Sequence, residues 1–208
     1  MITFSVILFL IVLLVSWFIF LFCKRVIYKL NKRVLARNMA LVKNGPYMAK
    51  FDELSEAEIR EKLIFPFFMV LGYNTYDMRE FQSYINRAAF YPDYVVKKWD
   101  SSKLCKRALS IKYIPFKDNA VDFDKKIFDD SAAGCKLDEL MDKLYFKSDY
   151  YVITNGYLYV FFNKKRRTGS KNFEFCFNLK NYSKKDAAQL AFYSKQYLFL
   201  EISDVYRP

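Results

Sequence analysis

The segment DYYVITNGYLYVFFN, residues 149–163, decides the fold of this chain. Two runs rich in β-branched and aromatic residues, 149–154 and 157–163, lie on either side of the dipeptide Asn155-Gly156. Asn-Gly between two such runs is a strong short-range signal for a β-hairpin, because both residues adopt positive φ at low cost. The sequence therefore predicts two adjacent antiparallel strands here.

Helices and further strands are expected on both sides of this hairpin. Ser55 is placed to cap a helix that Gly72 ends, and Pro66 is expected to kink it. The order helix, strands, helix, strands, helix predicts an α/β domain in which helices flank a mixed sheet. The expected helices are 54–72, 122–144 and 183–199, and the expected further strands are 80–86, 91–98, 108–114 and 174–179.

The N-terminal residues 2–23 form an apolar run of 22 residues without a charge. A helix of this length spans about 33 Å, enough to cross the hydrocarbon core of a bilayer. A cleaved signal peptide is disfavoured because no basic residue precedes the run and Phe18, Phe20 and Phe22 make poor cleavage neighbours. The sequence thus predicts a single transmembrane helix at 1–23.

The following segment, 24–50, contains eight basic residues and no acid. By the positive-inside rule we expect a single-pass protein of the inner (plasma) membrane with its C-terminal domain in the cytoplasm. The helix is expected to continue until Asn44-Gly45-Pro46, as a basic juxtamembrane helix that contacts anionic lipid. The remaining residues, 51–208, hold 26 basic and 22 acidic residues, a net charge of +4 against +12 for the whole chain.

The composition excludes several kinds of active site. The chain has no histidine, which removes hydrolases and nucleases that use a histidine base. Its four cysteines, Cys23, Cys105, Cys135 and Cys176, form no CxxC pair, so we expect reduced thiols rather than a zinc site. Any catalysis must come from carboxylates, lysine, tyrosine, serine or a metal held by carboxylates.

Short motifs follow one another between residues 54 and 197. They are SEAEIR at 55–60, LGY at 71–73, DYVV at 93–96, SIK at 110–112 and the hairpin at 151–162. In this order they resemble the N-terminal nuclease domain of type I restriction enzyme R subunits. The resemblance implies a restriction-endonuclease-like PD-(D/E)xK fold for residues 51–208, with the sheet flanked by helices.

The resemblance also implies a metal site. Glu56 and Asp93 would hold Mg²⁺, which lowers the pKa of a bound water and neutralises charge on the scissile phosphate. Lys112 would position or activate that water. The acid that the family has two residues before the lysine is replaced by Ser110.

This replacement leaves two alternatives open. In one, the nuclease is inactive and the fold remains as a binding or scaffolding module. In the other, the missing carboxylate comes from the following segment, where Asp122 and Asp124 are the candidates and Asp118 lies close by. Single substitutions at these positions would separate the two alternatives.

A basic segment follows the hairpin. It consists of Lys164, Lys165, Arg166 and Arg167, with Lys171 nearby, and it could contact a nucleic-acid backbone or anionic lipid, or simply be solvated.

Two functions are therefore expected. The first is a membrane-anchored, metal-dependent endodeoxyribonuclease that acts on or binds DNA, as in phage defence or DNA restriction. The alternative is an inactive nuclease-fold module that scaffolds a protein partner at the membrane. Neither requires a small-molecule cofactor.

Overall fold

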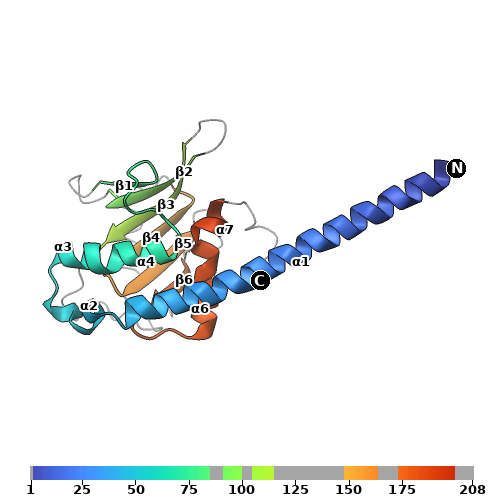
Figure 1. The fold of residues 1–208 in the computed structure, drawn as a ribbon. Coiled ribbons are helices and arrows are strands. Elements are labelled where there is room, and N and C mark those ends of the chain that lie inside the picture. The colour runs from blue at the N-terminus through green and yellow to red at the C-terminus, as the bar shows by residue number, and fades with distance from the viewer. Residues whose placement is uncertain (1, 85–90, 100–104, 115–147, 164–172, 200–208) are drawn as a thin grey trace.

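The chain forms an α/β domain from which one long helix projects, in a computed structural model (Figure 1). The structure describes residues 2–84, 91–99, 105–114, 148–163 and 173–199. The predicted helix at 122–144, and with it Asp118, Asp122 and Asp124, lies outside these residues, as does the basic segment Lys164–Arg167 with Lys171.

Six strands form one sheet in chain order, β1-β2-β3-β4-β5-β6. Every neighbouring pair is antiparallel except β3 and β4, which are parallel, so the predicted mixed sheet is confirmed. The strands are β1 (Phe81–Ser83), β2 (Tyr94–Trp99), β3 (Cys105–Tyr113), β4 (Tyr150–Thr154), β5 (Leu158–Asn163) and β6 (Phe173–Asn178).

The described helices gather on one side of this sheet (Figure 1). They are α1 (Ile2–Lys43), α2 (Pro46–Ala49), η1 (Phe51–Glu53), α3 (Glu56–Ile59), the π-helical turn η2 (Arg60–Ile64), α4 (Phe65–Val70), α6 (Lys184–Leu190), η4 (Ala191–Tyr193) and α7 (Lys195–Phe199).

The helix predicted from 54 to 72 is present and has the expected ends. Ser55 caps it, and a capping box joins Ser55 and Glu58 through reciprocal hydrogen bonds. Gly72 ends it with φ of +89°. Where a kink was expected at Pro66, the chain forms the π-helical turn, in which the Phe65 amide donates to the Arg60 carbonyl. A wider turn just before the proline accommodates a residue that has no amide hydrogen to donate.

The long helix α1 corrects one prediction. In the part of the chain that the structure describes, no helix is long and apolar enough to cross a membrane. The predicted fold with a membrane-spanning helix at 1–23 is therefore wrong.

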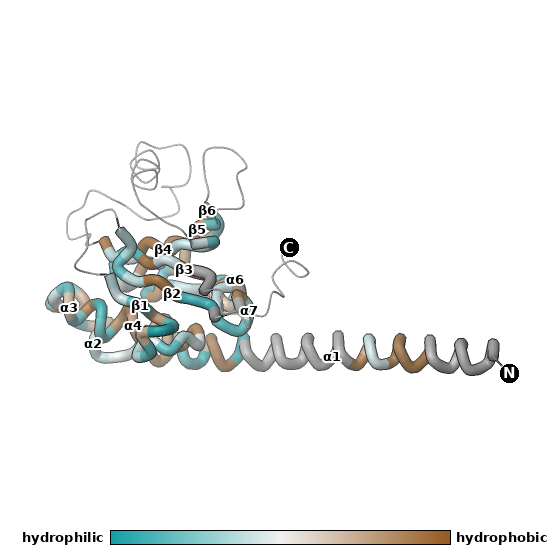
Figure 2. Tube along the Cα trace, turned by 90° about the horizontal axis from the view of Figure 1, so that it is seen from above, coloured by the Kyte–Doolittle hydropathy of each residue, from teal (hydrophilic) through white to brown (hydrophobic). Residues whose placement is uncertain are grey.

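The C-terminal part of α1 belongs to the domain. Leu35 and Met39 are buried in the main core, and α1 contacts both α4 and α6. The Lys43 ammonium lies 5.2 Å from the centre of the Tyr182 ring. Figure 2 shows that α1 runs along the domain here and extends beyond it towards the N-terminus. Part of the segment expected as a linker, 24–50, is thus a packed element of the fold.

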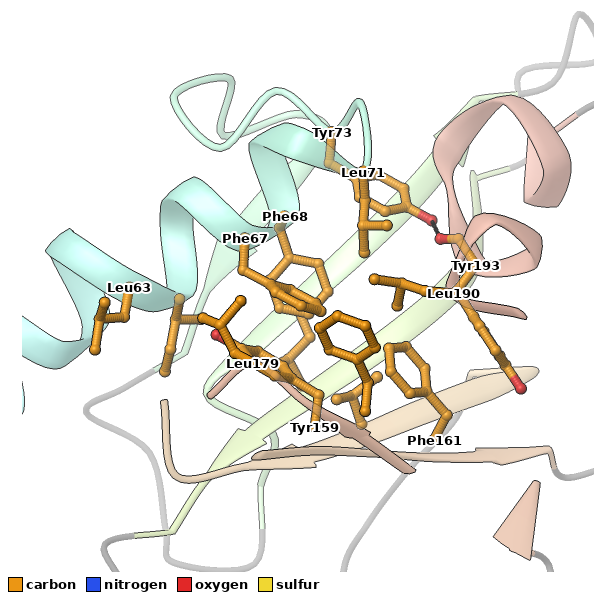
Figure 3. Packing of buried hydrophobic residues seen from close by; sticks show 14 of the residues in the cluster. Leu63, Phe67, Phe68, Leu71, Tyr73, Tyr159, Phe161, Leu179, Leu190 and Tyr193 are labelled. Atoms are coloured by element: carbon orange, nitrogen blue, oxygen red, sulfur yellow. Dashed lines mark hydrogen bonds between the residues drawn. The ribbon is translucent and has the colours of Figure 1, made fainter. Parts of the chain in front are cut away.

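Aromatic rings make up the core between the helices and the sheet (Figure 3). The Phe67 ring of α4 stacks on the Tyr159 ring of β5, with 3.5 Å between the ring centres. The Tyr73 hydroxyl donates to the Tyr193 carbonyl at 2.7 Å. This hydrogen bond connects the residues that follow α4 to the C-terminal helices. Burial of such large rings is the main favourable term that attaches the helices to the sheet.

The hairpin of β4 and β5 is confirmed, with a longer turn than predicted. The last paired residues are Thr154 and Tyr159, so four residues lie between them rather than two. The Asn155 side-chain oxygen accepts hydrogen bonds from the amides of Tyr157 and Leu158. Gly156 has φ of +103°, and a Cβ there would overlap Cγ2 of Ile59 in α3.

Gly156→Ala is expected to lower the free energy of unfolding by about 2–5 kcal/mol, because it combines positive-φ strain with overpacking against Ile59. Gly72→Ala is the matched control, since Gly72 also has positive φ but a Cβ there would meet only Lys195 Cβ at 3.6 Å. It should cost about 1–2 kcal/mol. Urea unfolding monitored by circular dichroism measures both. Equal losses would contradict the close approach of the turn to α3.

Candidate functional site

The sequence-predicted residues meet at one end of the sheet. Asp93 directly precedes β2, and its amide donates to the Ile111 carbonyl of β3 at 2.8 Å. Lys112 is the next residue of β3, and β3 runs parallel to β4, which ends at the turn that contains Gly156. That turn contacts Ile59 of α3, the helix that begins with Glu56. Glu56, Asp93 and Lys112 are therefore at the same end of the domain.

Asp93 and Lys112 form a buried ion pair. Their Oδ1 and Nζ atoms are 3.2 Å apart, and their side chains are 7% and 15% exposed. The second oxygen of Asp93 accepts from the Tyr113 amide at 2.6 Å, and Lys112 also donates to the Tyr91 carbonyl at 3.0 Å. Tyr94 and Ile111 are register partners in the antiparallel pair of β2 and β3, so Asp93 and Lys112 lie opposite each other. The pair joins β2 to β3.

Glu56 has a cationic partner too. Its Oε1 accepts from Nη2 of Arg60, one helical turn further along. The Glu56 side chain is 55% exposed, whereas that of Arg60 is 11% exposed. The Arg60 guanidinium lies over the Tyr113 ring, 4.8 Å from its centre. Arg60 was not among the residues predicted for the site, although the Glu-to-Arg spacing of four residues was a usable signal for this contact.

Two tyrosines line the same region. Burial raises the pKa of Tyr94 to about 12, an effect that the nearby Arg60 guanidinium opposes. Burial also raises the pKa of Tyr113, and the Glu56 carboxylate adds to that increase. Among the described residues, Nε and Nη1 of Arg60 and the Tyr94 hydroxyl are buried without a hydrogen-bond partner. The site thus contains polar atoms that the described part of the fold leaves unsatisfied.

Ser110 lies where the resemblance to the nuclease domain predicts an acid. It lies on the same face of β3 as Lys112, because side chains two residues apart in a strand point the same way. Ser110 and Ser148 are each 1% exposed, and their hydroxyl oxygens are 2.6 Å apart. A longer side chain at 110 would displace Ser148. The hydrogen bond between the two hydroxyls therefore closes this position.

The described residues do not fit a divalent metal ion. Among them, no group of three histidine, cysteine, aspartate or glutamate side chains could hold one. Each of the two carboxylates predicted as ligands, Glu56 and Asp93, is already paired with a cation. Mg²⁺ binds through several oxygen ligands, and the described part of the site brings no third carboxylate to join these two.

Comparison with models of protein families, with curated proteins and with solved structures finds no match.

Asp93→Asn should lower the free energy of unfolding by about 3–5 kcal/mol, because it leaves the Lys112 ammonium buried without a countercharge. Lys112→Met leaves the Asp93 carboxylate the hydrogen bond from the Tyr113 amide. The double variant should be more stable than Asp93→Asn alone. A double-mutant cycle from urea unfolding measures the coupling.

The control for this cycle is the pair of Glu61 and Lys62, whose side chains are 65% and 33% exposed. Glu61→Gln removes one partner of an ion pair at the surface, and it should leave stability unchanged. Additive effects of Asp93→Asn and Lys112→Met would show that the two side chains do not interact.

Tyr94→Phe should leave stability at pH 7 unchanged or increase it, since it removes a buried hydroxyl without a partner in the described structure. The folded-state pKa of Tyr94 lies above its unfolded value. The protonated phenol therefore stabilises the fold fully below about pH 10, and this stabilisation is lost as pH rises towards 12. Urea unfolding at pH 7, 9 and 10.5 should show the variant gaining on the wild type as pH rises. A constant difference would contradict this.

Proposed function

We propose that this chain is a nuclease-like domain that binds DNA without cutting it. The observation that carries the proposal is the buried hydrogen bond between Ser110 and Ser148. There the family motif has an acid, and this chain has a serine hydroxyl bonded to Ser148 in the interior. Without that acid, metal-dependent hydrolysis loses a ligand in the place where the fold would supply it.

The charges of the remaining site residues support the same proposal. Asp93 with Lys112, and Glu56 with Arg60, form two neutral pairs. A neutral site neither concentrates Mg²⁺ nor repels the phosphate backbone of DNA as exposed carboxylates would. The site is suited to contact with DNA rather than to its hydrolysis.

The basic helix supports DNA as the ligand. Residues 32–43 of α1 contain four basic residues and no acid. Because α1 packs on the domain through Leu35 and Met39, these charges are held against the folded domain. Arg33 and Arg37 are both exposed there. A fixed array of cations on one helix binds a polyanion and releases its counterions.

A second candidate is a scaffolding function, in which α1 binds a protein partner. Leu14 and Phe18 are 68% and 75% exposed, and they lie on one face of α1 because they are four residues apart. Contiguous exposed apolar side chains commonly mark protein contacts. A chain that binds no duplex DNA at low salt would favour this candidate.

The wild type should bind a fluorescent 20-base-pair duplex equally well in EDTA and in Mg²⁺, and it should not nick plasmid DNA with Mg²⁺ or Mn²⁺. Fluorescence anisotropy and agarose gels measure the two properties. Ser110→Glu should lower stability and restore no cleavage, because the site at 110 is closed. Metal-dependent nicking that Asp93→Ala abolishes would overturn the proposal and favour an acid from Asp122 or Asp124.

Replacing Arg33 and Arg37 by alanine should weaken DNA binding at every sequence and reduce the slope of log K against log salt by about 2, roughly one for each phosphate that is no longer neutralised. Arg79→Ala is the control, because Arg79 is also exposed but pairs with Asp77 before β1. An equal loss of affinity in both variants would assign the binding to general charge rather than to α1.

A further inference from the structure

The π-helical turn η2 places a buried guanidinium beside the Asp93–Lys112 pair. Arg60 is 9% exposed, and two of its three nitrogens, Nε and Nη1, have no hydrogen-bond partner among the described residues. A guanidinium only donates hydrogen bonds, so these atoms require acceptors. The Tyr94 hydroxyl is buried beside Arg60 and can both donate and accept, and its interaction with the Arg60 guanidinium opposes the rise in the pKa of Tyr94.

A buried guanidinium with unmet hydrogen bonds lowers the stability of a fold unless an acceptor or an anion binds it. A buried cation with incomplete hydrogen bonding destabilises a fold, and in many proteins an apolar residue would be more stable. π-helical turns are rare, and they occur frequently at functional sites. The donors lie close to the predicted site, because Arg60 stacks on Tyr113 and the Tyr113 amide donates to Asp93.

The third nitrogen of Arg60 already holds an anion, the carboxylate of Glu56. Arg60 is largely buried while the Glu56 side chain is 55% exposed. Because the Glu56 carboxylate is solvated while Arg60 is buried, exchanging Glu56 for another anion costs less than leaving Arg60 without a countercharge. An external oxyanion that brings several acceptor oxygens could take its place and satisfy more of the donors.

We propose that Arg60 is the phosphate-binding residue of this site, and that Glu56 is an intramolecular competitor that covers it in the absence of DNA. The ligand is a phosphodiester group, whose two free oxygens match the forked geometry of a guanidinium. This inference rests on the proposed function, since it names the residue that contacts the DNA backbone at the site. The Tyr94 hydroxyl is the neighbouring donor to the same group.

The test compares Glu56→Gln with Glu61→Gln. Both variants remove one negative charge from the same helical segment, but only Glu56 contacts Arg60, since Glu61 pairs with Lys62. Affinity for the 20-base-pair duplex is measured by anisotropy in EDTA. Glu61→Gln reports the general effect of charge, and Glu56→Gln should bind about threefold more tightly than Glu61→Gln.

Arg60→Gln should weaken duplex binding about tenfold, the reduction expected when one charge-assisted hydrogen bond to phosphate is removed. In the Arg60→Gln background, Glu56→Gln should give no gain beyond that of Glu61→Gln. This dependence of the Glu56→Gln gain on Arg60 separates competition for the DNA ligand from a general effect of charge, which would leave the two substitutions additive. Arg60→Lys keeps the charge without the fork, and it serves where Arg60→Gln does not fold.

A second measurement separates this inference from the proposed function. Inorganic phosphate should raise the unfolding temperature of the wild type but not that of Arg60→Lys. If this holds and no duplex binds, Arg60 is a phosphate site and the proposed DNA function falls. The opposite result is also possible: duplex DNA binds, Glu56→Gln has the same affinity as Glu61→Gln, and Arg60→Lys has the same affinity as the wild type. In that case the assignment of Arg60 is overturned and the proposed function stands.

Discussion

The arrangement of the site depends on the close approach of the β4–β5 turn to helix α3. Gly156 has no side chain, and its backbone at φ of +103° lets the Ile59 side chain lie where a Cβ would otherwise be. This contact and the stacked rings of Phe67 and Tyr159 hold the helices α3 and α4 on the sheet. Glu56 and Arg60 are thereby brought to the sheet end where Asp93 and Lys112 pair.

The site is a set of compensated charges with a few unsatisfied donors. Both carboxylates that the nuclease motif would use for a metal are paired with cations, and the position of the third is closed by Ser110 and Ser148. Two neutral ion pairs give this site no net negative charge with which to attract a small hard cation. The buried Nε and Nη1 atoms of Arg60 have no hydrogen-bond acceptor among the described residues.

The composition of helix α1 predicted a different environment for it than its packing in the structure shows. Its charge-free N-terminal run predicted a transmembrane helix, and its basic flank predicted a juxtamembrane segment. In the part of the chain that the structure describes, no helix meets the length and apolarity that a bilayer requires. The flank is also part of the fold, because Leu35 and Met39 are buried against the domain. Periodicity showed that this segment is helical, but it did not show what the helix packs against.

The sequence by itself determined the elements whose signals are local. The capping box at Ser55, the end at Gly72 and the hairpin around Asn155 each arise from residues within a few positions of one another. The pairing of Asp93 with Lys112 was also within reach, because they belong to the consecutive predicted strands 91–98 and 108–114. Only the tertiary structure decided the contacts of Ser110 with Ser148 and of Ile59 with Gly156. The residues of each contact are 38 or more positions apart in the chain. Ser110 meets Ser148 because β3 pairs with β4, and Ile59 meets Gly156 because α3 packs on the β4–β5 turn. No local sequence pattern encodes the register of β3 with β4 or the packing of α3.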